Sequence, residues 1–522
     1  MLQLTFLDSI LRLKIMKKNI FARIACALLA SLMLLTAVAC GSGDPADTTA
    51  AGGDATTTAA GGDAATTPAE TEAPTHDANG FWLDDLDPNL NYNGDTFNVL
   101  YWSDVEHPEF FAESQTGDVV NDAIYQRNQA VEERLNITFG WVGVDGDSGE
   151  NANFNHHVQQ ELLAGSHEFD LIAAYSLTTT AAAVNGYLYD LLDPACEHLN
   201  FDQPWWPDTL LEQATINNKL RFASGDISMN TLYMMYVCFV NTDLLEAHHL
   251  ENPAELVLDG KWTYDKFIEM CHGIYEDLDG NGQKNDKDRF GYMSSGIHVD
   301  PWFYGSGAVM ALQDANGDLQ ISETFGSETV INSIDKINSL LWDSIDGLYT
   351  DSVKHQGAFR DEQLLFMMDR ARVSFKVLAA NENCHYTIVP CPKYNEEQER
   401  YYTVMGNPFT LYAIPIDSTD PTRASAVMEC FASESYRTTT PAVFEITLKL
   451  KYAQDDITGQ MYDLIRQNVS FDIGRIFSSD LIGQSLFRNT ISGNRNSWAS
   501  DVKMNTKPLQ KKLEQLTKAF ED

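Results

Sequence analysis

The chain has 522 residues, of which 75 are Asp or Glu and 35 are Lys or Arg, so the formal net charge is −40. Such an acidic chain is a poor partner for nucleic acid or for an anionic membrane patch, because both attract basic surfaces. Residues 79–522 exceed what one hydrophobic core comfortably holds, so their length predicts two lobes.

The chain opens with a targeting segment. A basic patch begins at Met16, and the apolar run from Ile24 to Ala37 is too short to span a membrane. The run ends in Ala-Val-Ala-Cys, with the cysteine at position 40, and this spacing resembles a bacterial lipobox. We therefore expect residues 1–39 to be a signal peptide, with Met16 as the true start, and Cys40 to be lipidated. The alternative is an ordinary signal peptide with an incidental cysteine.

A low-complexity segment follows Cys40. Positions 41–74 are almost entirely Gly, Ala, Thr, Asp and Pro, and the unit TAAGGDA occurs at Thr49 and again at Thr58. Such a segment has nothing to bury, so residues 40–78 are predicted to form a flexible tether. No other apolar run is long enough for a bilayer. We expect residues 79–522 to lie outside the cell, held by lipid.

The first part of the folded region alternates between strand and helix patterns. β-prone runs occupy residues 96–101, 137–142 and 169–174, and helical periodicity occupies residues 120–135 and 158–163. This order predicts a mainly parallel α/β sheet.

The rest of the chain is of the same kind. Strands are expected over 232–240, 371–377 and 386–390, and helices over 264–275, 330–345, 421–432 and 460–467. Thr263 is the expected N-cap of the helix that follows it. Neither half ends at a linker, so the pattern predicts lobes built from interleaved segments.

The sequence lacks the common catalytic motifs. It has no nucleophile elbow, P-loop, dinucleotide-binding fingerprint or zinc-protease motif. Six cysteines remain after Cys40, none in a Cys-x-x-Cys pair, and they are interpreted mainly as buried thiols. Whether Cys384 and Cys391 form a disulfide stays open.

Aromatic residues at expected element ends form the candidate ligand site. In open α/β sheets, ligands bind outside the carboxyl ends of the strands. Flat rings beside hydrogen-bonding groups suit the apolar faces and polar edges of sugars. The candidates are Trp102, Asp104, Tyr175, Trp205, Trp206, Trp302 and Tyr304. The alternative for each aromatic residue is a place in the core.

The stretch that starts at Asp277 resembles a calcium loop. Oxygen-bearing residues fall at positions 1, 3, 5, 7 and 12, and glycine falls at position 6. The candidate ligands are Asp277, Asp279, Asn281, Gln283 and Asp288. The exit is strand-like around residue 290, and position 12 is Asp instead of Glu, so a sensor EF-hand is disfavoured. A structural calcium clip is favoured over a merely acidic turn.

Several short motifs occur in a recognisable order. After the lipobox and tether come VVNDAIYQRN at 119, FDLI at 169, PWW at 204, FVNTDLL at 239, DGKWT at 259, DRFGY at 288 and IVPCPK at 388. Together they resemble the extracellular solute-binding lipoproteins of carbohydrate ABC importers, family 1, over nearly all of residues 79–522.

The resemblance implies a fold and a role. The fold is α/β, two-lobed and periplasmic-binding-protein-like (Venus-flytrap), with a hinge. Lobe 1 would hold residues 81–235 and 401–436, and lobe 2 would hold residues 236–400 and 437–522. The role is to capture a carbohydrate, an oligosaccharide by expectation, and to deliver it to ABC permease subunits. The protein would act as a monomer without catalysis and without a required cofactor.

Two other functions remain open at this point. One is an extracellular enzyme that acts on polysaccharides, since paired carboxylates are easily found in so acidic a chain. The other is a surface receptor that passes its ligand to a sensor kinase. No motif in the chain selects one solute.

Overall fold

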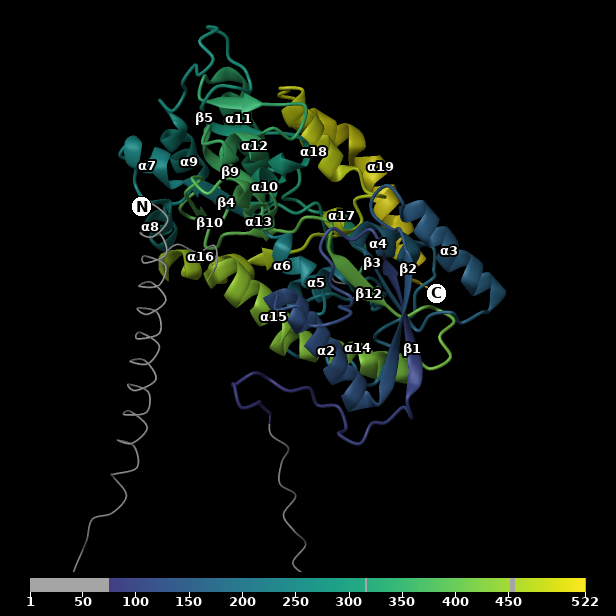
Figure 1. Cartoon of the computed structure of the whole chain (residues 1–522). Helices are drawn as coiled ribbons and strands as arrows, with labels where there is room; N and C mark the ends of the chain where they lie inside the picture. Colours follow the sequence, from purple (N-terminus) through teal and green to yellow (C-terminus); the bar gives the residue numbers. More distant parts are fainter. Residues whose placement is uncertain (1–74, 315–316, 451–455, 522) are drawn as a thin grey trace, which may run out of the picture. The chain divides into compact units, whose positions relative to one another are not determined.

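The computed structural model describes residues 75–314, 317–450 and 456–521. Within this part, the chain forms two main β-sheets with helices packed around them (Figure 1). The predicted signal peptide, Cys40 and nearly all of the tether lie outside the described residues. Among the described residues, no helix is long and apolar enough to cross a membrane.

The first sheet has four strands in the order β12-β3-β1-β2. Its strands are β1 (Asp95–Trp102), β2 (Ile137–Val144), β3 (Leu171–Tyr175) and β12 (Thr410–Ala413). β1 pairs in parallel with β2 and β3, and β12 is antiparallel to β3. Helices α2 (Val119–Leu135) and α3 (Asn151–Ala164) connect β1 to β2 and β2 to β3. The predicted alternation of strands and helices is confirmed.

Capping explains where α2 begins and ends. The carboxylate of Asp118 accepts hydrogen bonds from the backbone N–H groups of Val120 and Asn121, which have no partner inside the helix. Asn136 ends the helix in the left-handed conformation with φ 49°. The next residue starts β2, so a single residue separates helix from strand.

The second sheet has five strands in the order β10-β4-β9-β5-β8. They are β4 (Tyr236–Asn241), β5 (Phe290–Ser294), β8 (Gly347–Tyr349), β9 (Leu364–Arg370) and β10 (Tyr386–Val389). Every residue of β4, β5 and β9 is buried, as expected for strands covered on both faces. The surrounding helices include α7 (Thr242–Ala247), α8 (Pro253–Leu258), α9 (Tyr264–Cys271), α11 (Glu328–Asn338) and α12 (His355–Arg360). Thr263 caps α9 as predicted, with its side chain accepting from the N–H of Lys266.

Two predicted strands are partly or wholly wrong. Residues 371–377 are not a strand: β9 ends at Arg370, and Val373–Lys376 form the short helix α13. The predicted strand 232–240 loses its first residues to helix α6 (Asn230–Tyr233). Short apolar runs do not carry a long enough period to separate helix from strand. Sheet pairing decides instead, because the ladder of β4 with β9 ends where Tyr236 meets Arg370.

The chain passes between the two sheets more than once. Met235, just before β4, forms an antiparallel bridge with Met405, which lies on the way back to β12. Beside this crossing, β11 (Thr403–Val404) pairs in parallel with β13 (Val469–Ser470). The first sheet thus draws strands from both sides of the second sheet in the sequence, as interleaved lobes require.

The C-terminal half completes both lobes with helices. α14 (Pro421–Arg437) packs against α2, and α16 (Asp456–Gln467) packs against β10. α17 (Ile473–Ile476), α18 (Gly483–Ser492) and α19 (Trp498–Ala519) follow. β6 (Ala311–Gln313) and β7 (Leu319–Ile321) pair as an antiparallel two-stranded sheet.

The six described cysteines are all buried and free, so Cys384 and Cys391 are not joined by a disulfide.

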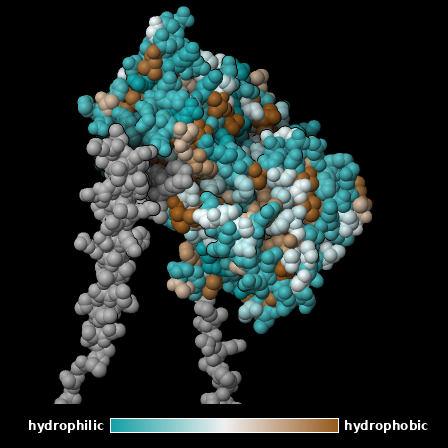
Figure 2. Space-filling model, in the orientation of Figure 1, coloured by the Kyte–Doolittle hydropathy of each residue, from teal (hydrophilic) through white to brown (hydrophobic). Residues whose placement is uncertain are grey.

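The face in Figure 2 is largely hydrophilic, with hydrophobic residues in small, scattered groups.

Candidate ligand-binding cleft and calcium loop

The carboxyl ends of the first sheet carry two of the predicted aromatic residues. Trp102 ends β1 and Tyr175 ends β3, and their ring centroids lie 5.3 Å apart. The indole N–H of Trp102 donates to Oγ1 of Thr410 at 2.9 Å, so this ring is held inside the lobe. Asp104 accepts from the backbone N–H groups of Gly146 and Asp147 and orders the loop after β2.

The second sheet presents a polar edge. Tyr236 begins β4 and Arg370 ends β9, and the antiparallel register places them directly opposite each other. Their side chains therefore share one face of the sheet. Ser295 follows β5, the neighbour of β9, at the same edge.

The two edges lie close enough for charged groups at one edge to act on a side chain at the other, and we call the space between them the cleft. Burial raises the pKa of Tyr175 to about 12, and the positive charges of Arg475, Arg370 and Arg488 act in the opposite direction. Tyr175 belongs to the first sheet, whereas Arg370 belongs to the second, so this electrostatic contact crosses the cleft. Arg475 comes from α17, and its Nη1 donates to Asp300 at 2.6 Å.

A second set of contacts crosses the cleft beyond β1. Glu106 forms ion pairs with Arg372 and, at 3.8 Å, with Lys376. The ring of His107 lies 5.2 Å from that of Phe375, and both rings pack against Tyr233 of the first lobe at 4.8 Å. These contacts join the loop after β1 to the segment after β9.

A hollow of greater volume than the spaces in this cleft lies elsewhere. It has a volume of about 670 Å³ and lies beside the crossing segments, where Trp205, Tyr436, Phe444 and Arg466 contribute to its wall. Within the cleft, Ser176 and Arg475 border a space of about 10 Å³. We place the candidate site in the cleft because polar groups of both lobes converge there.

Three predicted aromatic residues lie in the interior. Trp302 is fully buried, and its indole N–H donates to the hydroxyl of Tyr292 at 3.2 Å. The indole N–H groups of Trp205 and Trp206 both donate to Glu429, at 3.1 and 2.9 Å. Trp206 is 2% exposed, so it packs in the interior in this structure, while Trp205 also lines the large hollow.

The other candidates lie nearer the cleft. The hydroxyl of Tyr304 donates to Asp472 at 3.1 Å, and the ring lines a space of about 130 Å³ with Tyr402 and Phe471. Tyr175 and Tyr304 are thus the predicted aromatic residues closest to the converging charges. Sequence reasoning missed five residues of the cleft: Glu106, His107, Tyr236, Arg370 and Arg475. The sequence pattern held no signal for Tyr236 or Arg370, because the predicted strands placed Tyr236 in the middle of one strand and Arg370 before the start of another.

The calcium loop brings three predicted ligands together. Carboxylate oxygens of Asp277, Asp279 and Asp288 all lie within 4.8 Å of one another. Asp288 is fully buried, and its Oδ1 has no hydrogen-bond partner among the described residues. Asn281 and Gln283 lie in the same turn, where Oδ1 of Asn281 accepts from the N–H of Gln283 at 2.6 Å.

The backbone of this loop is wrapped around Asp277. Its two carboxylate oxygens accept from the N–H groups of Gly280 and Gly282, at 2.8 and 2.7 Å. These hydrogen bonds, with that of Gly282 the largest contribution, lower the pKa of Asp277. Both glycines have positive φ, 69° and 73°, a backbone conformation that tight turns often require. The loop leads into β5, so the predicted strand exit is confirmed.

Comparisons with known proteins identify the fold. No family model matches the chain, and no curated protein matches it. Solved structures do match, at low sequence identity. The cyclic α-maltosyl-1,6-maltose-binding protein of Arthrobacter globiformis is 13% identical with a TM-score of 0.53, over 80% of this chain and 99% of that one.

Two further structures are similar to the same extent. The galacto-N-biose/lacto-N-biose I-binding protein of an ABC transporter from Bifidobacterium longum, in complex with lacto-N-biose, is 11% identical with a TM-score of 0.52. It aligns over 81% of this chain and 98% of that one. An ABC substrate-binding protein of Listeria monocytogenes in complex with cycloalternan is 11% identical, with a TM-score of 0.51 and coverages of 80% and 98%. The chain therefore has the expected two-lobed, periplasmic-binding-protein-like α/β fold.

Proposed function

We propose that this protein is a lipid-anchored, extracellular solute-binding protein that captures a carbohydrate and delivers it to an ABC permease. The main support for this proposal is the cleft between the two sheets. Charged and aromatic residues of both lobes, among them Tyr175, Arg370 and Glu106, lie near one another there. Lobes of this kind close on a solute and shield its hydrogen bonds from water. The fold is shared with proteins whose ligands are sugars.

The chemistry of the cleft agrees with binding and release of an unchanged solute. Asp300 is 2% exposed and already ion-paired with both Arg475 and Arg488. Asp369 is fully buried and hydrogen-bonded on both oxygens. Neither carboxylate is free to act as the acid or base of glycoside hydrolysis, which needs two such groups around the bond.

Calorimetry tests the binding step. Full-length protein in detergent is titrated with a panel of mono- and oligosaccharides, and the sugars are recovered and separated by chromatography. We expect at least one to bind and to be recovered intact. Recovery of shortened products would favour the polysaccharide-acting enzyme, and the absence of any binding would contradict the proposal.

The anchor and the calcium site belong to the same proposal. Cys40 would carry the lipid, and Cys40→Ala should release the protein from the cell membrane into the medium, as judged by fractionation. Asp277, Asp279, Asn281, Gln283 and Asp288 would hold a structural calcium ion with oxygen ligands. Three converging carboxylates support this site, and one of them has a buried oxygen without a hydrogen-bond partner in the described part of the chain.

A further inference from the structure

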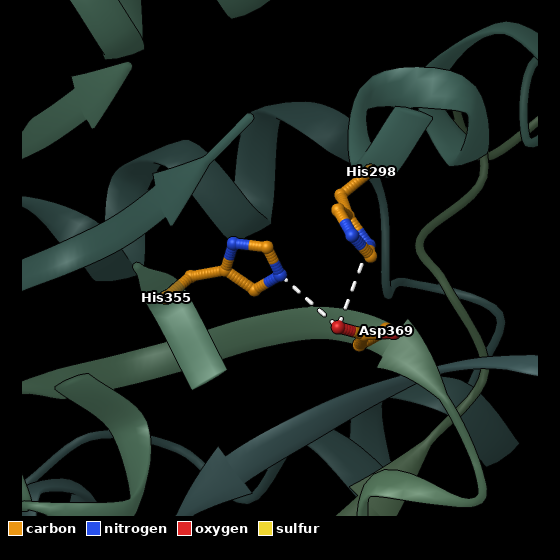
Figure 3. A group of neighbouring side chains, drawn as sticks. All are labelled: His298, His355 and Asp369. Atoms are coloured by element: carbon orange, nitrogen blue, oxygen red, sulfur yellow. Dashed lines mark hydrogen bonds and ion pairs between the residues drawn. The ribbon is translucent and has the colours of Figure 1, made fainter. Parts of the chain in front are cut away.

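A buried cluster lies behind the cleft at the end of β9. Figure 3 shows the rings of His298 and His355 directed at Asp369, and each of these residues is at most 1% exposed. Oδ2 of Asp369 accepts from Nε2 of His355 at 3.0 Å and from Nε2 of Gln356 at 2.7 Å. Oδ1 accepts from the backbone N–H and from Nε of Arg370, at 2.6 and 3.1 Å. Both oxygens of Asp369 are therefore occupied by the protein.

The cluster is better explained by Arg370 than by a metal ion. Ligand atoms of the three residues lie within 4.8 Å of one another, a spacing that a metal ion would accept. However, Asp369 is already paired with a guanidinium group, and a second cation beside it would be repelled. The cluster instead holds one edge of Arg370 in a fixed direction.

The other edge of Arg370 has no such partner. Its Nη1 and Nη2 make no hydrogen bond with any residue that the structure describes, whereas Nε is bound to Asp369. The stem is confined as well, because a side chain at Gly406 would come within 2.7 Å of Cδ of Arg370. A guanidinium fixed on one edge and open on the other is preorganised for a planar acceptor.

Further donors at this edge of the sheet lack partners. The hydroxyl of Tyr236, directly opposite Arg370, is buried without a hydrogen bond in the described part of the chain, and so is the hydroxyl of Ser295. A buried polar group without a partner costs free energy, so these groups call for a ligand or for water.

The neighbouring carboxylates, in contrast, already accept a hydrogen bond on each oxygen. Asp300 accepts from both Arg475 and Arg488. Asp472 accepts from the hydroxyl of Tyr304 and the N–H of Met310, both at 3.1 Å. The centre of the cleft thus offers donors in excess of acceptors. A neutral sugar hydroxyl both donates and accepts, whereas a carboxylate or phosphate accepts at every oxygen.

We propose that the captured carbohydrate carries an anionic group, and that Arg370 binds this group while Asp369 and its two histidines act as positioning residues. This inference rests on the proposed function and names its substrate class. The positive charges of Arg370, Arg475 and Arg488 that act on Tyr175 across the cleft agree with it. A uronate and a sugar phosphate supply the same chemistry.

Paired titrations test the inference. Uronate oligosaccharides and sugar phosphates are each compared with the neutral parent sugar by calorimetry on the full-length protein, at low and high salt. In at least one pair we expect the charged member to bind about tenfold tighter at both salt concentrations, because a buried guanidinium is screened much less than an exposed charge. The arm that shows this difference identifies the anion.

Variants then assign the effect to Arg370. Arg370→Gln should abolish the preference for the charged sugar, and Arg370→Lys should retain part of it, because a lysine keeps the charge without the fork. Arg360→Gln is the control: this arginine lies on α12, is paired with Asp361, and should leave the preference unchanged. Melting curves exclude misfolded variants, and the preference of the wild-type protein for the charged sugar is measured independently of the variants.

The outcomes separate the two proposals. If sugars bind but the neutral parent equals or exceeds its charged partner in every pair, the anionic substrate class is wrong and the proposed function remains. If Arg370→Gln folds and keeps the full preference, Arg370 is not the anion-binding residue. If no sugar of either kind binds, the proposed function fails as well.

Discussion

Single buried residues show how the core of this protein responds to pH. Glu429 on α14 lies against Trp205 and Trp206 and accepts their indole N–H groups. Burial raises its pKa to about 8, although the hydrogen bond from Trp206 acts in the opposite direction. In the unfolded chain the carboxyl group returns to its ordinary value near 4.5. Between these values the folded state holds a proton that the unfolded state releases.

We therefore expect Glu429 to make the protein less stable as pH rises from about 4.5 to 8. The slope from this group is at most about 1.4 kcal/mol per pH unit. Glu429→Gln cannot ionise, so its melting temperature should fall less steeply than that of the wild type across this range. Glu133→Gln, an exposed change on α2, is the control for loss of one charge. Parallel curves for wild type and Glu429→Gln would contradict the prediction.

Trp302 tests the difference between a core and a ligand-binding aromatic residue. Its ring lies 4.7 Å from that of Tyr264 and 5.4 Å from that of Phe267. Trp302→Ala should lower the free energy of unfolding by about 3–5 kcal/mol, because it leaves a large cavity. Trp82→Ala, at a 44% exposed site, should have a much smaller effect. Urea denaturation measures the free energy of unfolding of both variants. Equal midpoints for Trp302→Ala and Trp82→Ala would contradict a core role for Trp302.

The candidate cleft was only partly predictable at this scale. The sequence shows that Trp102 and Tyr175 end strands, but it does not show which side of the strand end each ring faces. Trp206 and Trp302 look equally suitable as sugar platforms, and only packing reveals them as interior residues. Arg370 escaped prediction because its role depends on Asp369, whose partners His298 and His355 are distant in sequence.

At the scale of elements, local signals predicted most of the architecture. The alternation of β1, α2, β2, α3 and β3 follows from periodicity and end signals that need no tertiary information. Residues 371–377 were predicted wrongly because their local pattern fits a strand. The true strand lies just before them, where β9 pairs with β4 and β5. Long-range pairing of this kind cannot be derived from one segment.

The loop from Asp277 to Asp288 is the element with the sharpest test. Calcium that binds only the folded state should raise the melting temperature. At 100 times the dissociation constant, it adds about 2.7 kcal/mol to the free energy of unfolding. Dissociation constants of extracellular calcium modules run to about 10⁻⁴–10⁻³ M, so this gain needs about 10–100 mM calcium. The measurement is a thermal shift in calcium, in magnesium and in EDTA.

Variants make this test specific. Asp279→Asn removes an exposed carboxylate of the set and should abolish the calcium-dependent shift. Asp318→Asn, in the turn between β6 and β7, should keep it. A wild-type melting temperature that is the same in calcium and in EDTA would identify the loop as an acidic turn.

On the scale of the whole molecule, charge and fold act at different ranges. The net charge of −40 repels an anionic solute at a distance. Salt screens exposed charges within about 8–10 Å, whereas a buried guanidinium is screened much less. The arginines of the cleft therefore dominate at contact, and the overall acidity mainly affects solubility and encounter.

Closure of the two lobes provides the last prediction. Glu106 of the first lobe is paired with Arg372 and Lys376 of the second, so it stabilises the closed form relative to an open one. Glu106 is 38% exposed on its side chain, so solvent and salt weaken the pair, which should contribute about 0.2–1 kcal/mol. Since ligand binds the closed form best, Glu106→Gln should weaken sugar affinity about two- to fivefold. Small-angle X-ray scattering should show a larger radius of gyration for the ligand-free variant than for the ligand-free wild type, and added salt should reduce this difference.

Glu113→Gln, an exposed change in the same loop, is the control. If Glu106→Gln matches the wild type in both affinity and radius, this ion pair does not stabilise the closed form.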